Sequence, residues 1–319
     1  MERPRLTFIL PLAILGGILA VSTASIFIRY AQQDAPSLVI AAFRLSLASL
    51  ILGPLALTRF RTELRALTRR EWLLGGLSGF FLALHFATWI SSLEFTSVAS
   101  SVVLVTTTPL WVALFAPLFL RETITRAILG GMVLALAGGI IIGLSEACAW
   151  NGGLLCGGAG QAESGLGLWG NFLALAGAWM AAGYIMIGRN LRAKMSLIPY
   201  IFVVYGMAAL VLIVLMLGAG QTPLGYPLAT YAWMLALAVV PQLLGHSTFN
   251  WALGYLPASL VSITLLGEPI GSIILAYFLL RESPSPLELV GGVLILAGIY
   301  LASQKTEKDA LAEQASISQ

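Results

Sequence analysis

The chain contains one stretch of sequence twice: LRETITRAILGGMVLALAG at residues 120–138 recurs as LRESPSPLELVGGVLILAG at residues 280–298. The two copies lie 160 positions apart, and the same offset relates Pro109 to Pro269. Because the register holds over long distances, we predict that the chain folds as two similar halves.

The composition is that of a membrane protein. Of the 319 residues, 59% are hydrophobic and only 10% are charged, whereas soluble domains carry about 25% charged residues. Ten apolar runs of roughly 19–24 residues are each long enough to cross a hydrocarbon core of about 30 Å. They lie near residues 8–29, 37–57, 72–93, 97–120, 125–145, 167–188, 197–217, 230–252, 257–280 and 286–304.

Each half holds five runs, which is an odd number, so the second half enters the membrane from the opposite side. We therefore predict an all-α polytopic membrane protein with ten transmembrane helices in two inverted five-helix repeats. Inverted repeats around one central site are typical of secondary transporters. The expected units are a first repeat (1–145), an extracytoplasmic loop (146–166), a second repeat (167–304) and a disordered cytoplasmic tail (305–319).

Basic residues predict the orientation. If the N-terminus is cytoplasmic, the outer side keeps only Arg29 and Arg281. The remaining basic residues outside the apolar runs fall on the inner side: Arg3, Arg5, Arg59, Arg61, Arg65, Arg69, Arg70, Arg121, Arg126, Arg189, Arg192, Lys194, Lys305 and Lys308. This asymmetry predicts cytoplasmic N- and C-termini in a bacterial-type inner membrane. The net charge of +3 therefore reflects topology, and we expect no nucleic-acid partner.

The two cysteines of the chain, Cys148 and Cys156, share the loop 146–166. A local disulfide is a candidate there, because the predicted topology exposes the loop to an oxidising compartment. Two free thiols are the alternative. We expect no metal site, since no histidine lies nearby.

Ionisable side chains at bilayer depth cost about 2.5–3.5 kcal/mol each, so each calls for an explanation. Glu268 lies near the middle of the ninth run, with Gly267, Pro269 and Gly271 around it. Proline removes a backbone donor, and Pro109 interrupts the fourth run at the matching position. Paired interruptions are a sequence sign of a transport site. Glu268 is therefore a candidate proton or substrate group; alternatively it caps a helix or pairs with a buried arginine.

Arg44 lies in the outer half of the second run and stays charged. It needs an anionic partner, carbonyl groups or water. A substrate carboxylate and Glu268 are two candidates. Snorkelling of the guanidinium to the outer interface is the third interpretation.

Two polar stripes occur at helical spacing. His85 and Trp89 share one face of the third run, and His246 and Asn250 share one face of the eighth. In the sixth run, Trp179 and Tyr184 are candidates for further aromatic surface; all of these residues, with Arg44 and Glu268, form the predicted substrate-binding set. Aromatic rings beside polar groups suit an amphipathic organic solute. Hydrogen bonding between helices is the alternative.

The fifth and tenth runs carry no polar centre, so we expect peripheral scaffold helices or a dimer face through Gly139-x-x-x-Gly143. The chain has no phosphate-binding glycine loop, zinc-protease motif or Gly-x-Ser-x-Gly motif. We therefore expect neither an enzyme nor a cofactor. The chain is expected to be a monomer or a homodimer.

These motifs resemble one known family. The ten runs, Pro109, Leu-Gly-Glu-Pro at 266–269 and the repeated Leu-Arg-Glu endings at 120–122 and 280–282 are similar to the EamA-type branch of the drug/metabolite transporter superfamily. The resemblance covers residues 8–304. It implies a metabolite exporter or exchanger in which the first four spans of each repeat surround a central cavity and the fifth and tenth stand outside.

Within that branch, aromatic amino-acid exporters are the nearest match, through His85 and Phe95-Thr96-Ser97. The predicted function is a secondary transporter, an exporter or exchanger of a small amphipathic metabolite with an amino acid as the leading candidate. The expected partners are that small molecule, the lipid bilayer and, as a further candidate, protons. A facilitative permease or channel and a ligand sensor that does not transport are the alternatives.

Overall fold

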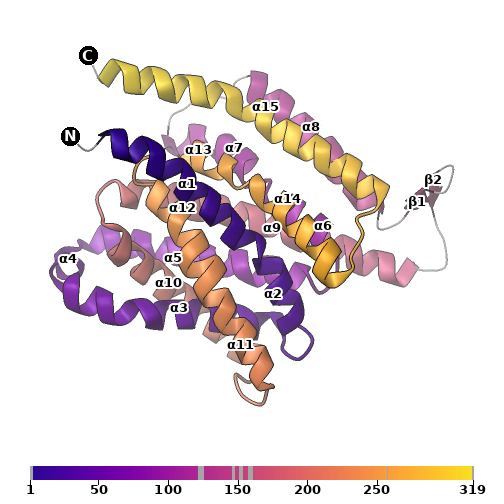
Figure 1. The fold of residues 1–319 in the computed structure, drawn as a ribbon, viewed down its shortest axis with the longest axis horizontal. Coiled ribbons are helices and arrows are strands. Elements are labelled where there is room, and N and C mark those ends of the chain that lie inside the picture. Colours follow the sequence, from indigo (N-terminus) through magenta and orange to yellow (C-terminus); the bar gives the residue numbers. More distant parts are fainter. Residues whose placement is uncertain are drawn as a thin grey trace.

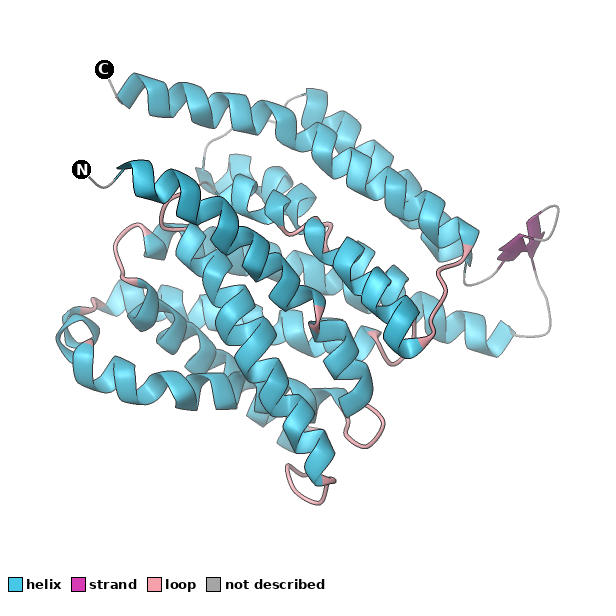
Figure 2. Cartoon of the chain, viewed as in Figure 1, coloured by secondary structure: helices cyan, strands magenta, loops and turns pink. Residues whose placement is uncertain are grey.

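The computed structural model describes residues 3–120, 126–145, 148–150, 154–156, 161–256 and 258–317. Within these residues the chain is helical apart from one short β-hairpin (Figures 1 and 2). Both termini lie at one end of the helix bundle, and the hairpin projects from the opposite end (Figure 1).

The first half of the chain contributes eight helices in the described residues. They are α1 (Arg3–Ser22), α2 (Ala24–Ala31), α3 (Ser37–Arg59), α4 (Arg61–Ala66), α5 (Arg69–Ser92), α6 (Val98–Val105), α7 (Thr108–Leu120) and α8 (Arg126–Ser145).

The second half follows the hairpin strands β1 (Cys148–Trp150) and β2 (Leu154–Cys156). Its helices include two π-helical segments, η1 and η2. They are α9 (Gln161–Arg192), α10 (Leu197–Gly218), α11 (Leu228–Leu237), η1 (Ala238–His246), α12 (Ser247–Ala252), α13 (Ala258–Thr264), α14 (Gly267–Leu275), η2 (Ala276–Leu280) and α15 (Pro286–Ile317).

The described helices include ten apolar segments at the positions of the ten predicted runs. Seven are long and apolar enough to cross a bilayer, and three are shorter. The shorter ones are Leu129–Ile142, Gly267–Leu280 and Pro286–Leu301. Both halves therefore supply five apolar helical segments.

Two of these segments are interrupted just before their prolines. α6 ends at Val105 and α7 begins at Thr108, one residue before Pro109. Proline cannot donate to the carbonyl four residues earlier, which is that of Val105. The hydroxyl of Thr108 donates to this carbonyl at 2.9 Å, so the interruption leaves it paired.

The second interruption follows the same logic. α13 ends at Thr264 and α14 begins at Gly267, two residues before Pro269. The carbonyl freed by this proline belongs to Leu265, and the backbone N–H of Glu268 donates to it at 3.0 Å. The predicted helix breaks are therefore present at matching points of the two halves.

The repeat is also visible in side-chain contacts. Arg29 donates to the carbonyl of Leu93 at 2.5 Å, and Arg189 donates to that of Leu253 at 2.8 Å. Donor and acceptor both move by 160 positions between the two contacts. Each arginine thus ties the end of one apolar helix to the end of another at the same place in its repeat.

α8 and α15 pack along each other at the edge of the bundle (Figure 1). A Cβ atom on Gly138 would lie 2.5 Å from the carbonyl oxygen of Gly291, so this close approach needs glycine. Gly139, from the predicted dimer motif, instead faces Leu104 of α6, where an added Cβ would lie 3.9 Å from Leu104 Cδ2. α8 and α15, the two helices without a polar centre, therefore pack against each other. This is the arrangement expected of peripheral scaffold helices.

The connection between the two halves contains a short β-hairpin. β1 and β2 pair antiparallel with Cys148 directly opposite Cys156. The cysteine side chains lie outside the described part of the structure, so the disulfide stays a prediction.

The C-terminal tail is a correction. We expected disorder over 305–319, whereas α15 continues as a helix to Ile317. The segment contains no glycine or proline after Gly298, and alanine, glutamate, lysine and glutamine dominate it. These are strong helix formers, so a helix already started in the apolar part can continue into the polar tail.

Candidate functional site

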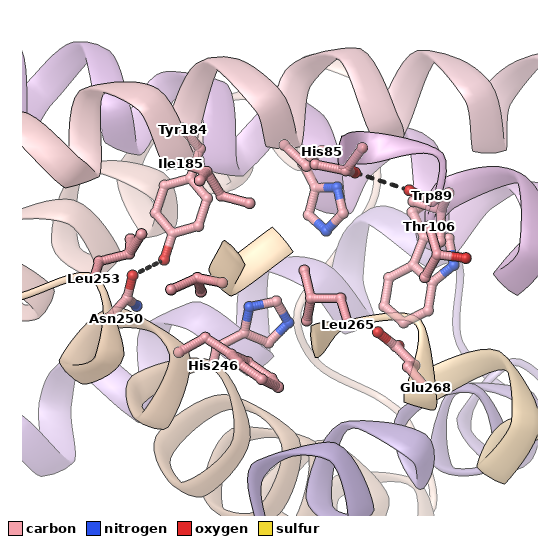
Figure 3. A pocket seen from close by; sticks show the side chains of 15 residues that line it. His85, Trp89, Thr106, Tyr184, Ile185, His246, Asn250, Leu253, Leu265 and Glu268 are labelled. Carbon is pink, nitrogen blue, oxygen red and sulfur yellow. Dashed lines mark hydrogen bonds between the residues drawn. The ribbon is translucent and has the colours of Figure 1, made fainter. Parts of the chain in front are cut away.

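A cavity lies between the two halves at the level of both helix breaks (Figure 3). It offers about 50 Å³ of room for water-sized molecules, which is space for roughly three to five waters. Organic ligand sites are usually about 300–1,000 Å³. The site is therefore nearly closed in this conformation. Its walls are His85, Trp89, Val105, Thr106, Thr108, Ala181, Tyr184, Ile185, His246, Phe249, Asn250, Leu253, Val261, Leu265 and Glu268.

Six of the eight predicted substrate-binding residues line this cavity: His85, Trp89, Tyr184, His246, Asn250 and Glu268. The four-residue spacing of His85 and Trp89 places both on one face of α5. Their rings stack at 6.0 Å between centroids. The imidazoles of His85 and His246 approach each other to 6.4 Å across the cavity, as Figure 3 shows.

The ring of His85 is held by the neighbouring helix α9. Its Nδ1 lies 3.0 Å from the carbonyl oxygen of Gly177. Because a carbonyl oxygen only accepts, this contact assigns the proton to Nδ1 and leaves Nε2 of a neutral ring as an acceptor. Gly177 permits the close approach, since an added Cβ would lie 3.3 Å from Trp89 Cβ.

The other end of the cavity carries a hydroxyl–amide network. Tyr184 donates to Asn250 Oδ1 at 2.5 Å, and Asn250 Nδ2 donates to Tyr205 at 3.1 Å. The hydroxyl of Tyr205 lies 3.2 Å from Ser247 Oγ. Both hydrogen-bonding groups of the Asn250 amide therefore have partners, which fixes the orientation of this side chain on α12.

Arg44 lies behind the cavity wall and is fully buried. Its Nε donates to Gln242 Oε1 at 2.8 Å, and its guanidinium carbon lies 4.0 Å from the centroid of the Phe86 ring. The guanidinium is thus neither at the bilayer interface nor exposed, and the snorkelling interpretation of the sequence is wrong.

Several buried donors beside Arg44 have no partner among the described residues. They are Nη1 and Nη2 of Arg44 and Nε1 of Trp89. A buried donor without an acceptor costs about 1–3 kcal/mol, and more for a charged group. The cluster therefore provides donors for an anion.

Glu268 lines the cavity on the same side as Trp89, in the first turn of α14 (Figure 3). Within the described residues its carboxylate makes no hydrogen bond, and no ion pair joins it to Arg44. Its backbone carbonyl accepts weakly from Ser22 at 3.4 Å. The geometry gives this carboxylate no capping role in the described residues and leaves it facing the cavity.

The glycines around Glu268 bring α14 close to α1. An added Cβ on Gly267 would lie 2.7 Å from Ile18 Cγ2, and one on Gly271 would lie 2.3 Å from Ser22 Oγ. Both glycines are therefore positions of close helix approach. Their role in gating stays a prediction.

Trp179 is a predicted site residue that does not take part in this arrangement. It does not line the central cavity, and its ring packs edge-on against Trp111 at 5.2 Å and Phe172 at 6.2 Å. Trp179 shares α9 with Tyr184 but is five residues away. Five residues correspond to about 500° of helix rotation, so the two side chains point in different directions.

Other parts of the site were missed. Phe86 and Tyr205 orient Arg44 and Asn250, and their signal in the sequence was weak because each is also an ordinary buried aromatic residue. The apolar walls gave no signal, since nothing distinguishes a cavity-lining leucine from one in the core. They include Val105, Ala181, Ile185, Phe249, Leu253, Val261 and Leu265.

Polar contacts join the two halves at one end of the bundle. We call this the Glu282 end; it comprises the connections at residues 31–37, 92–98 and 280–286. Arg29 forms an ion pair with Glu282 at 3.1 Å, and the backbone N–H of Val98 donates to Glu282 at 2.9 Å. Glu288 accepts from the hydroxyls of Ser97 and Ser100, the latter at 2.7 Å. These carboxylates join the second repeat to the first.

The sequence matches one family profile twice. The profile of the EamA-like transporter family matches residues 8–144 and again residues 168–304, so the second match repeats the first 160 positions later. The chain belongs to this family. It is therefore a multi-pass membrane transporter and not an enzyme, and the predicted all-α fold of two repeated halves is confirmed.

Relatives with curated names point the same way. An uncharacterized transporter of Archaeoglobus fulgidus is 26% identical over 88% of this chain and 92% of its own length. A probable terminal-alkyne amino-acid exporter of Streptantibioticus cattleyicolor is 24% identical over 64% of this chain and 63% of its own length. A solved crystal structure aligns with 93% of this chain over 97% of its own length. The TM-score is 0.64 and the sequence identity is 18%, so the two proteins share the fold.

Proposed function

We propose that this transporter moves a small amphipathic metabolite, with an amino acid as the first candidate, by alternating access. The observation that carries the proposal is the cluster of unpartnered donors around Arg44, next to an aromatic cavity that also holds an unpaired carboxylate. The similarity to a probable amino-acid exporter supports the same substrate class.

The two charged groups suit the two ends of a zwitterion. The guanidinium of Arg44 offers both Nη groups, and guanidinium binds carboxylates in two parallel hydrogen bonds. Glu268 offers a carboxylate that can accept from an ammonium group or carry a coupling proton, and the Glu268→Gln variant separates these two roles. The stacked rings of His85 and Trp89 offer apolar contact. Arg44 reaches the substrate only if Trp89 of the cavity wall and Phe86, which packs against the guanidinium, both move, because the guanidinium does not line the cavity.

Alternating access accounts for the small cavity. A site that holds only a few waters cannot enclose an amino acid, so substrate entry requires the spans to separate. The two helix breaks border the cavity through Thr106 and Leu265, and interrupted helices are where such folds bend. The ties at the Glu282 end hold this side of the bundle closed in the present conformation.

Counterflow in liposomes tests the proposed function. Vesicles preloaded with one unlabelled amino acid should take up the same radiolabelled amino acid faster than empty vesicles, and the uptake should saturate. A panel of aromatic, aliphatic and charged amino acids, run with and without a pH gradient, separates substrate class from energy source. A channel-like permease would give the same uptake in preloaded and empty vesicles, and a sensor would bind the amino acid without uptake. Either result would contradict the proposal.

We further propose the inner-membrane orientation predicted from the basic residues, with both termini cytoplasmic. Single cysteines introduced at Gln161 and Gln319, in a chain whose Cys148 and Cys156 are replaced by serine, should differ in reactivity. A membrane-impermeant maleimide added to intact cells should label the cysteine at 161 and spare the one at 319. Equal labelling of both would contradict the topology.

The Glu282 end provides a test of closure. Glu282→Gln removes the ion pair to Arg29 and should increase the labelling rate of a cysteine placed at Thr106 in the cavity wall several-fold. Stability should change little, since the two side chains are 25% and 29% exposed and such pairs contribute about 0–1 kcal/mol.

Glu94→Gln is the matched control at the same end. Glu94 accepts from Ser37 and joins two helices of the first repeat only. Glu94→Gln should leave the labelling rate of the cysteine at Thr106 unchanged. If both variants accelerate labelling equally, the Arg29–Glu282 contact has no special part in closure.

A further inference from the structure

A second, larger cavity lies on the outside of the bundle. It measures about 570 Å³ and is formed by α6, α7, α8 and α9, which places it in the usual size range of organic ligand sites. We call it the lateral groove. Its walls are Leu104, Thr107, Leu110, Trp111, Leu129, Met132, Val133, Ala135, Leu136, Gly139, Ile140, Leu168, Asn171, Phe172 and Leu175.

The lateral groove opens on a lipid-facing surface. Four of its wall residues on α8 are also among the exposed large apolar residues: Leu129 at 58%, Val133 at 62%, Leu136 at 67% and Ile140 at 57%. In a multi-pass membrane protein, exposed apolar side chains of a spanning helix contact hydrocarbon. The groove therefore continues the surface that lipid chains already cover.

The inner wall of the groove is the helix break of the fourth span. Thr107 and Trp111 line the groove, whereas Thr106 and Thr108 line the central cavity. The indole Nε1 of Trp111 donates to Thr107 Oγ1 at 3.1 Å across the start of α7. Only the chain of the break itself separates the two spaces at this point.

A buried amide lies on the groove wall. Asn171 is 7% exposed, its Oδ1 accepts from Thr96 at 2.8 Å, and its Nδ2 has no partner in the described residues. It sits six residues after the start of the apolar span at Gly165, which corresponds to a depth of about 9 Å along the helix. The stacked rings of Trp169 and Phe172, each about half exposed, lie beside it. Such exposed aromatic rings are typical of the membrane interface.

We propose that the lateral groove binds one acyl chain of a bilayer phospholipid, with its ester end toward Asn171, and that this chain packs against the Thr107–Trp111 break. The wall is almost wholly apolar, so water would gain few hydrogen bonds there. A hydrocarbon chain matches the wall, and lipid is the medium into which the groove opens. An ester carbonyl at the aromatic end supplies the acceptor that Asn171 Nδ2 lacks once this buried amide turns toward the groove.

Trp111 provides the probe. The full-length transporter is reconstituted in phosphatidylcholine vesicles whose acyl chains are brominated near their middle, and tryptophan fluorescence is compared with that in unbrominated vesicles. Bromine quenches an indole that its chain contacts. Trp111→Phe should lower the quenched share of the emission, because a contributing tryptophan is removed. Trp89→Phe is the control, since Trp89 is 2% exposed and lies in the central site.

Filling the groove gives an independent test that leaves every tryptophan in place. Gly139→Leu adds a side chain where a Cβ would lie 3.9 Å from Leu104 Cδ2, so the backbone need not move. It should lower quenching by about the amount that Trp111→Phe does. Gly130→Leu is the matched control, because it lies on the same helix with its Cβ position 3.7 Å from Leu301 and outside the groove wall.

The two measurements decide the proposal together. Lower quenching in Trp111→Phe and in Gly139→Leu, with no decrease in Trp89→Phe or Gly130→Leu, supports a chain in the groove. Equal quenching in the wild type and Trp111→Phe would overturn it, and so would equal effects of Gly139→Leu and Gly130→Leu. Monodisperse size-exclusion profiles of all variants establish that each one is folded.

Discussion

Arg44→Gln is expected to abolish transport of carboxylate substrates while the folded yield stays close to that of the wild type. The arginine is fully buried, and its Nη groups have no acceptor among the described residues. Removing an uncompensated buried charge relieves a desolvation cost. The shorter amide can still face Gln242, so the loss of one hydrogen bond is limited.

The expected loss of affinity is large because two charged hydrogen bonds to the substrate disappear together. Each is worth about 1.5–3 kcal/mol, which together correspond to a loss of about 100-fold or more. Arg44→Lys should lose less, about tenfold, since it keeps the charge but not the two parallel donors.

Counterflow with an amino acid and with its carboxamide measures this directly. The wild type should prefer the carboxylate, and Arg44→Gln should transport the two alike or neither. Arg65→Gln serves as the control, because Arg65 is exposed on α4 and does not line the cavity. A folded variant that keeps full preference for the carboxylate would show that Arg44 does not bind substrate. Failure to fold would contradict the expected folded yield, and Arg44→Lys would then provide the measurement of preference.

Glu268→Gln is expected to abolish accumulation driven by a pH gradient and to leave substrate exchange largely intact. Glutamine keeps the shape of the side chain but carries no titratable proton. In the described residues the carboxylate of Glu268 has no hydrogen-bond or ion-pair partner, and it lines the cavity. The substitution therefore breaks no structural contact, and normal folded yield is expected.

The assay compares accumulation under an imposed pH gradient with exchange in its absence, on the same preparation. Glu94→Gln is the control for loss of a carboxylate elsewhere in the protein. If folded Glu268→Gln loses both accumulation and exchange, Glu268 binds the substrate amine and carries no proton. If accumulation is normal, Glu268 has neither role and coupling must be sought at another group, with the two histidines first.

The helical architecture followed from the sequence to a large extent. The ten apolar runs needed only length and composition, because a membrane-spanning helix must satisfy its own backbone over about 20 residues. The breaks before Pro109 and Pro269 followed from the missing proline N–H. The expected disorder after residue 304 was wrong, because the helix-forming composition of the tail outweighs its charge and α15 continues to Ile317.

The candidate site could be predicted from the sequence only in part. The stripes of His85 with Trp89 and of His246 with Asn250 could be predicted, because residues four apart share a helix face. The sequence could not predict which neighbouring helix each stripe faces. Trp179 met the same sequence criteria as Tyr184, yet rotation about α9 turns it toward Trp111 and away from the cavity.

By itself, the sequence determined the number of spans, the repeat with its offset of 160 and the positions of both helix breaks, because all three depend on local backbone chemistry and on periodicity along the chain. The tertiary structure alone decided that Arg44 lies behind Phe86 with Gln242 as its hydrogen-bond partner, and that Glu268 faces the cavity without a partner among the described residues. It also decided that the fourth span separates a central cavity from a lateral groove. These features depend on the rotation and the separation of helices distant in sequence, which are set by close packing at glycines such as Gly177 and Gly271, and no local pattern encodes them.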